Sequence, residues 1–171
     1  VLQMVNHGIT IAALFLIVGY VEARTGTRRL SDYGGLAKRM PIMASVMLIA
    51  TLSSLGLPGL NSFAGEFLSL LGAFQSSTLF GFLGTAVVIP AAWYMIRLFQ
   101  GMMQGPRKIE GPVAVLERKN ALRDIQLGEF LVILPLLLLI FYIGFQPQVL
   151  TFLMEPTVVN TLQHFGSILI H

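Results

Sequence analysis

The stretch Leu55-Gly56-Leu57-Pro58-Gly59-Leu60-Asn61 interrupts an apolar region that runs from residue 40 to residue 74. A straight helix of that length would measure about 52 Å, whereas the hydrocarbon core of a bilayer is about 30 Å thick. Pro58 lacks an N–H and clashes with the preceding helical turn, and Gly59 tolerates backbone conformations that other residues avoid. We therefore predict one broken helix, with its break at 56–61. The break residues are Gly56, Pro58, Gly59 and Asn61.

The composition indicates a membrane protein. The 171 residues are 55% hydrophobic and only 11% charged, with a net charge of +3, whereas ordinary soluble domains are about 25% charged. So few charges cannot cover a soluble surface, which excludes a disordered tail, a nucleic-acid-binding domain and a typical soluble enzyme. Since the chain has no cysteine, it cannot form disulfides or thiolate metal sites.

Four apolar regions have the length of a membrane span, which is about 20 residues. We predict an all-α integral membrane protein with a single domain over 1–171 and four crossings, the second of them broken. Its first residues already have the composition of a helix interior, so we expect a piece of a longer protein. The predicted crossings are 3–21, 40–74, 79–99 and 125–147.

The positive charges fix the predicted orientation. The 11 Lys and Arg residues lie in the segment 22–39, at the end of the third crossing and in the segment 100–124. Lys and Arg concentrate in cytoplasmic loops. Four crossings place both basic segments on the cytoplasmic side, whereas two crossings within 40–74 would separate them.

Several smaller expectations concern the ends of the crossings. Glu22 with Arg24 is predicted to be a solvated anchor, and the charges of 100–124 are also predicted to be solvated. A second interpretation is that Arg97 or Glu129 contacts a neighbouring subunit, and the sequence does not decide between the two. The tail 151–171 is predicted to be an amphipathic helix on the opposite membrane face or against a partner. Its apolar residues at helical spacing are Val158, Leu162, Phe165 and Leu169.

Glu66 is the strongest functional candidate. It is the only charged side chain between Arg39 and Arg97, and it lies just beyond the break. A carboxylate inside a membrane is costly, so it points to a functional site facing the helix bundle. Broken helices at mid-membrane recur in ion transporters. The alternative is a structural glutamate that locks two helices together.

His7 is the second candidate, in the apolar segment that opens with Asn6-His7-Gly8. A neutral imidazole accepts a proton on one nitrogen and donates from the other, which suits a proton relay. A histidine that only packs between helices is an equally good interpretation. For the small polar residues of the spans, simple helix contact is favoured. These residues are Thr10, Thr51, Ser53, Ser54 and Ser69.

Two motifs resemble a known family. The first consists of Leu2–Gly8, Ala13–Leu16 and Gly34–Ala37. The second consists of the longer runs Ala50–Gly59 and Asn61–Phe67. Together they resemble the M-type antiporter-like subunits of respiratory complex I, the proton-translocating NADH:quinone oxidoreductase. The resemblance runs through all four crossings, although it reaches the level of motifs only between Leu2 and about Phe74.

The resemblance implies a C-terminal fragment containing helices 11–14 of a 14-helix subunit, with the broken helix as helix 12. It implies that Glu66 is the terminal protonatable residue of a buried polar axis, where the sister L and N subunits carry lysine. His7 would link that residue to a lysine in a part of the subunit outside this sequence. Neighbouring L and N subunits would be the partners, together with lipid and protons.

We therefore predict proton translocation by a non-redox subunit of an NADH:quinone oxidoreductase, with Glu66 and His7 as its site residues. The expected location is the bacterial inner membrane, or else the mitochondrial inner or thylakoid membrane. No cofactor is expected, because no phosphate loop or dinucleotide-binding glycine motif is present. No metal is expected either, since His164 and His171 stand apart from acidic residues. The alternatives are a multisubunit Na⁺/H⁺ antiporter, a membrane-bound hydrogenase and a structural scaffold.

Overall fold

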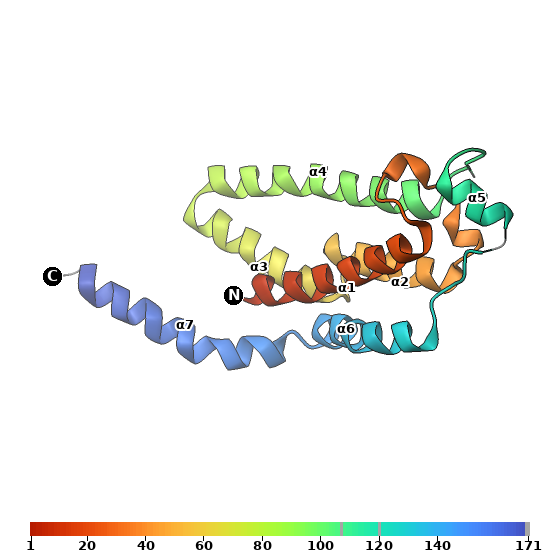
Figure 1. Cartoon of the computed structure of the whole chain (residues 1–171). Helices are drawn as coiled ribbons and strands as arrows, with labels where there is room; N and C mark the ends of the chain where they lie inside the picture. Colours follow the sequence, from red (N-terminus) through yellow and green to blue (C-terminus); the bar gives the residue numbers. More distant parts are fainter. Residues whose placement is uncertain (107, 120, 170–171) are drawn as a thin grey trace.

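The computed structural model describes residues 1–106, 108–119 and 121–169, apart from the side chains of 117 and 165–169. Within these ranges the chain is helical and contains no strand (Figure 1). The long helices are α1 (Leu2–Thr25), α2 (Pro41–Ser54), α3 (Asn61–Ser76), α4 (Thr78–Met103), α6 (Leu127–Phe145) and α7 (Gln148–Leu169). Shorter elements are η1 (Leu30–Asp32), η2 (Leu36–Lys38) and α5 (Pro112–Arg118).

Three helices are long and apolar enough to cross a membrane, namely α1, α4 and α6. The apolar helix α2 is shorter. In Figure 1, α2 and α3 follow one another alongside α1 and α4. The core lies where α1, α2 and α6 meet, and its fully buried side chains include Ile17, Met47 and Ile133. These findings support an integral membrane protein built from helices.

The segment between α2 and α3 consists of two consecutive turns. Gly56 has a φ of 65°, its N–H donates to the Ser53 carbonyl, and the next N–H donates to the Leu52 carbonyl. This pairing is the Schellman ending of a helix, which favours glycine. The Leu60 N–H then donates to the Leu57 carbonyl at 3.0 Å across Pro58 and Gly59, whose φ is 93°. Proline followed by a glycine with positive φ is the sequence of a type II turn.

Helix α6 packs directly against these turns. A Cβ added at Gly144 would lie 2.6 Å from the Leu60 Cα and would also collide with the Gly59 carbonyl oxygen. Only glycine allows two backbones to approach so closely. The end of α6 therefore covers the segment that separates α2 from α3.

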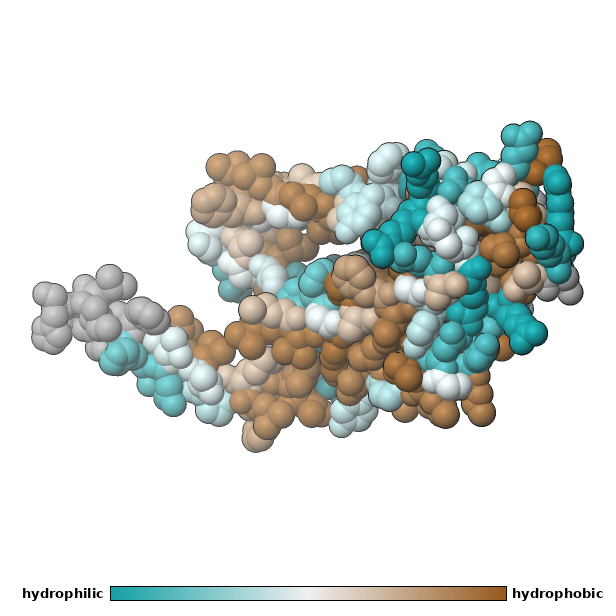
Figure 2. All heavy atoms as spheres, in the orientation of Figure 1, coloured by the Kyte–Doolittle hydropathy of each residue, from teal (hydrophilic) through white to brown (hydrophobic). Residues whose placement is uncertain are grey.

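The two basic segments lie together at one end of the bundle, although they are far apart in the sequence (Figure 1). The Gly35 N–H donates to the Gln104 carbonyl at 2.9 Å. Figure 2 shows hydrophilic residues gathered at this end and hydrophobic residues over the helices beside it. The two basic segments therefore share one end of the bundle, and the membrane side that they face stays a prediction.

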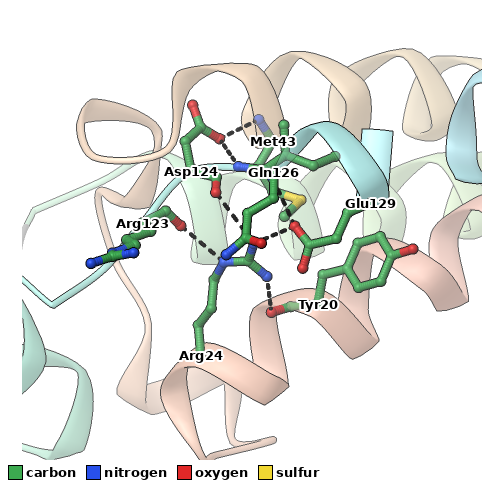
Figure 3. A network of polar contacts seen from close by, with 8 residues as sticks. Tyr20, Arg24, Met43, Arg123, Asp124, Gln126 and Glu129 are labelled. Atoms are coloured by element: carbon green, nitrogen blue, oxygen red, sulfur yellow. Dashed lines mark hydrogen bonds and ion pairs between the residues drawn. The ribbon is translucent and has the colours of Figure 1, made fainter. Parts of the chain in front are cut away.

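A polar network closes the same end (Figure 3). The Arg24 guanidinium pairs with the Glu129 carboxylate and donates to the Arg123 and Asp124 carbonyls. The Asp124 carboxylate accepts from the N–H groups of Ile42 and Met43, which open α2, at 2.8 and 2.9 Å. The network thus ties the end of α1 to the starts of α2 and α6.

One expectation about this end was wrong. Arg24 is not a solvated partner of Glu22, because its side chain is only 12% exposed and it pairs with Glu129. Glu22 pairs instead with Arg28. In the segment 100–124 the predicted solvation of the charges holds for side chains such as Lys108, Glu110 and Arg118, which are exposed, whereas the apolar Val113, Ala114 and Leu122 are buried. Apolar residues spaced between the charges allow this segment to pack onto the bundle.

Helix α7 leaves the bundle at the end opposite the basic segments and contacts α6 (Figure 1). Val158 and Leu162 on it are exposed. Whether this helix lies on the membrane face or against a partner stays a prediction. The side chains of Phe165 and Leu169, and all of His171, lie outside the described residues.

Candidate functional site at the helix break

Glu66 lies on α3, just after the turns that separate this helix from α2. Its carboxylate is half-buried and accepts a hydrogen bond from Gln3 Nε2 of α1 at 3.2 Å. His7 lies one turn further along α1 and is exposed. Of the two predicted site residues, Glu66 therefore lies at the interface of α1 and α3, and the hydrogen bond to it comes from a third residue, Gln3.

Gly56 provides the space for the carboxylate. A Cβ at this position would lie 3.1 Å from the Glu66 Cδ and would collide with Oε2. The residue that ends α2 with a left-handed conformation is therefore also the residue against which the carboxylate rests. Of the predicted break residues, Gly56 has the most direct contact with Glu66.

A small cavity of about 120 Å³ opens beside the carboxylate. Its wall consists of Glu66, the end of α2 and the middle of α4, and its residues are Ser54, Leu55, Glu66, Val87, Val88, Ala91 and Ala92. One water molecule occupies about 30 Å³ in the liquid, so the cavity has room for several. The Glu66 carboxylate and the Ser54 hydroxyl are polar groups that such waters can bind.

A buried row of polar side chains connects α1 to the break. Asn6 Nδ2 donates to the Asn61 carbonyl at 2.7 Å, and Asn61 Nδ2 donates back to the Asn6 carbonyl at 3.0 Å. Thr10 and Ser53 share a hydrogen bond of 2.8 Å, and Ser53 Oγ also donates to Asn61 Oδ1 at 2.6 Å. All four side chains are almost fully buried. The start of α3 is therefore held against α1 by paired hydrogen bonds.

Sequence reasoning missed Gln3 and Asn6 as contributors to the site. The available signal was their spacing, because Gln3, Asn6 and Thr10 follow an i, i+3, i+7 pattern that places them on one face of a helix. Thr10 and Ser53 hydrogen-bond across helices, whereas simple helix contact was favoured for them from the sequence. Of the other small polar residues, Ser54 lines the cavity, Thr51 is buried, and Ser69 donates to the Gly65 carbonyl.

Some polar atoms at this interface have no partner. Gln3 Oε1, Asn6 Oδ1 and Thr51 Oγ1 are buried without a hydrogen bond. Buried polar atoms are usually paired with protein or ordered water. Across the described ranges, no group of three or more His, Asp and Glu residues is arranged to hold a metal ion.

The fold and this site define a class of protein. It is an apolar helical membrane protein in which a carboxylate lies beside the turns between two helices and next to a cavity with room for water. Comparison with known proteins makes the class specific. Residues 1–90 match the family described as NADH:quinone oxidoreductase/Mrp antiporter, transmembrane, and the chain belongs to this family.

Individual relatives agree with this assignment. The chain is 36% identical over 166 residues to NADH-quinone oxidoreductase subunit M of Mycobacterium tuberculosis. This match covers 97% of the chain and 29% of the relative. It is 39% identical over 165 residues to subunit M of Rickettsia prowazekii, and this match covers 96% of the chain and 32% of the relative. It resembles a chain of respiratory complex I from Thermus thermophilus with bound NADH, with a TM-score of 0.77, 31% identity and coverage of 88% and 30%.

The resemblance noted from the two motifs is thereby confirmed, and it extends along most of the chain. The chain spans less than a third of the length of these relatives.

Proposed function

We propose that this chain is part of the antiporter-like subunit M of an NADH:quinone oxidoreductase and that it translocates protons. Glu66 is the residue that takes up and releases the proton, toward the membrane face that carries α7. The observation that carries the proposal is the position of its carboxylate, at the break between α2 and α3 and beside a cavity of about 120 Å³. Waters in this cavity supply the hydrogen-bonded path that a side chain inside a membrane needs.

The proposed topology has four crossings. Helices α1, α4 and α6 each cross once, and α2 and α3 together form the second, broken crossing. The 14 and 16 residues of these two helices correspond to about 21 and 24 Å at 1.5 Å per residue, so neither comfortably spans a core of about 30 Å. The basic segments face the cytoplasm, and the membrane is a bacterial inner membrane.

In this proposal the chain has a non-redox role. NADH oxidation and quinone reduction take place in other subunits, and this chain binds neither reactant and holds no cofactor. Its partners are the neighbouring L and N subunits of the membrane arm. The charges of Arg24 and Glu129 are paired with each other within the chain, so contacts with neighbours would use other surfaces.

The test is proton pumping in membrane vesicles that contain the intact complex and oxidise NADH. Glu66→Gln and Glu66→Ala are expected to abolish most of the pumping and of the coupled quinone reduction, whereas Glu66→Asp retains part of both. Glu155→Gln is the matched control, because Glu155 is an exposed glutamate of α7, and it should pump normally. Full pumping by an assembled Glu66→Ala complex would exclude the proposal. Loss of assembly instead of pumping would indicate a structural scaffold.

His7 has a secondary role in this proposal. It interacts with Glu66 electrostatically and without a direct hydrogen bond, so it would act through water. His7→Ala is expected to lower pumping less than Glu66→Ala does. Unchanged pumping in His7→Ala would favour the packing interpretation.

The family description itself favours one second candidate, because it also covers Mrp antiporters. A multisubunit Na⁺/H⁺ antiporter would show sodium-dependent proton movement without NADH. A membrane-bound hydrogenase would be identified by the soluble subunits that copurify with the chain. The subunit M relatives support the oxidoreductase over both. Mass spectrometry of the copurifying subunits separates the three.

A further inference from the structure

Gln3 is placed against Glu66 by a close contact between two helices. A Cβ added at Gly65 of α3 would lie 2.9 Å from the Gln3 Cα, so only glycine allows α1 and α3 to approach this closely. Gln3 Nε2 donates to Glu66 Oε1 at 3.2 Å. The other polar atom of the same amide, Gln3 Oε1, is buried and has no hydrogen-bond partner.

A carboxyl group that gains and loses a proton changes its hydrogen-bonding needs. The ionised group only accepts hydrogen bonds, whereas the protonated group also donates one. A partner with donors alone suits the first state, and a partner with acceptors alone suits the second. A side-chain amide carries both kinds of atom, and rotation about its terminal bond exchanges them. A buried polar group left without a partner is destabilising.

We propose that Gln3 is a positioning residue that satisfies the Glu66 carboxyl in both of its protonation states. Nε2 donates to the ionised carboxylate, as observed. When the carboxyl is protonated, the amide rotates and Oε1 accepts the new O–H. The proton that enters or leaves stays on Glu66, and no bond of Gln3 breaks. This inference rests on the proposed function, because it assumes that Glu66 is the group that titrates.

Among the described groups near Glu66, Gln3 is the one that hydrogen-bonds to its carboxylate. His7 of α1 is the titratable group that interacts with the carboxylate. From α4 the cavity receives only apolar side chains, and from α2 it receives the Ser54 hydroxyl. The charged residues of the helices packed around α3 are engaged elsewhere, Arg97 over the Trp93 ring and Glu129 with Arg24.

The experiment compares two variants of Gln3 in the intact complex in its native membrane. Gln3→Met keeps the length and shape of the side chain and removes the amide, whereas Gln3→Asn keeps the amide on a shorter stem. A net hydrogen bond of 0.5–1.5 kcal/mol corresponds to about a two- to tenfold effect. We therefore expect Gln3→Met to lower pumping per assembled complex by about that factor, and Gln3→Asn to lower it less. Gln75→Met, the same change at an exposed position of α3, should have no effect.

A residue that merely fills space would give the reverse order, with Gln3→Met pumping normally and Gln3→Asn impaired, and that result would overturn the inference. An infrared measurement checks the same point independently. The carbonyl band that disappears in Glu66→Gln should move to higher wavenumber in Gln3→Met, because the protonated carboxyl loses its acceptor. An unmoved band would overturn the inference while Glu66 keeps its role. Normal pumping in Glu66→Gln would instead remove the proposed function itself.

Discussion

At the scale of single residues, the site depends on a glycine as much as on its acid. Gly56 ends α2 in a left-handed conformation with a φ of 65°, and the Glu66 carboxylate occupies the space that its side chain would fill. Any other residue would destabilise the site in two ways, because its backbone would be strained and its side chain would displace the carboxylate. The local geometry of the break and the position of the acid are therefore set by the same residue.

Gly56→Ala is expected to lower both stability and pumping. The left-handed conformation costs an L-residue about 1–2 kcal/mol, and the added methyl would push the Glu66 carboxylate out of its place beside Gln3. Thermal unfolding of the detergent-solubilised complex and vesicle pumping measure the two effects. The control is Gly72→Ala on α3, where nothing lies within 4 Å of the added Cβ. It should be neutral or stabilise slightly, and equal losses in both variants would contradict this account.

The sequence predicted this site only in part, for physical reasons. Glu66 and the turns between α2 and α3 could be singled out because charge, proline and paired glycines are rare inside an apolar region. Gln3 and Asn6 were not singled out, because a neutral amide inside a span has no such signature until its partner is known. Their partners lie 63 and 55 residues away in the sequence, so no local pattern connects them.

At the scale of elements, the ends of the helices depend on distant segments. Helix α2 begins at Pro41 without a side-chain cap from its own N-cap residue. Its free N–H groups are instead satisfied by Asp124, which is 82 residues away from Ile42. The charges of the segment that carries Asp124 were predicted to be solvated, and Asp124 departs from this prediction because its carboxylate caps α2. Long-range capping of this kind is not encoded in the local sequence.

Asp124→Ala should destabilise the protein by about 1 kcal/mol, the usual cost of losing a helix cap. Asp124→Asn is the matched variant, because asparagine caps helices about as well as aspartate, and it should keep most of the stability. The readout is the thermal midpoint of the solubilised complex. Equal midpoints for the alanine and wild-type proteins would show that water replaces the carboxylate at no cost.

The contact of α6 with the break supplies a second test at this scale. Gly144→Ala places a methyl against the Gly59 and Leu60 backbones, and backbones cannot move aside as a flexible side chain can. We expect a loss of about 1–3 kcal/mol, as for overpacking of a core. Gly128→Ala lies on the same helix with nothing within 4 Å of its added Cβ, and it should behave like the wild type. A Gly144→Ala protein as stable as Gly128→Ala would argue that α6 does not support the break.

At the scale of the whole molecule, the bundle separates its charges from its site. The basic segments gather at one end (Figure 1), and the network of Arg24, Asp124 and Glu129 joins three helices there. The helical class and the clustering of basic residues followed from composition and from the distribution of Lys and Arg. The Arg24–Glu129 pair did not, because its two residues are 105 positions apart and several other charges were available to each.

The number of crossings can be measured directly, because the chain contains no cysteine and a single introduced thiol gives a clean signal. Ser31, Ser76 and Glu110 are exposed and lie in three successive connections or helix ends. If α2 and α3 form one broken crossing, Ser31→Cys and Glu110→Cys react with an impermeant maleimide from the cytoplasmic side, and Ser76→Cys reacts from the opposite side. If α2 and α3 each crossed the membrane, Ser31 and Ser76 would share a side and Glu110 would face the other. The comparison of inverted and right-side-out vesicles therefore decides whether the turns at Gly56 and Gly59 lie within the membrane, where Glu66 needs the cavity, or at its surface, where the carboxylate would be solvated.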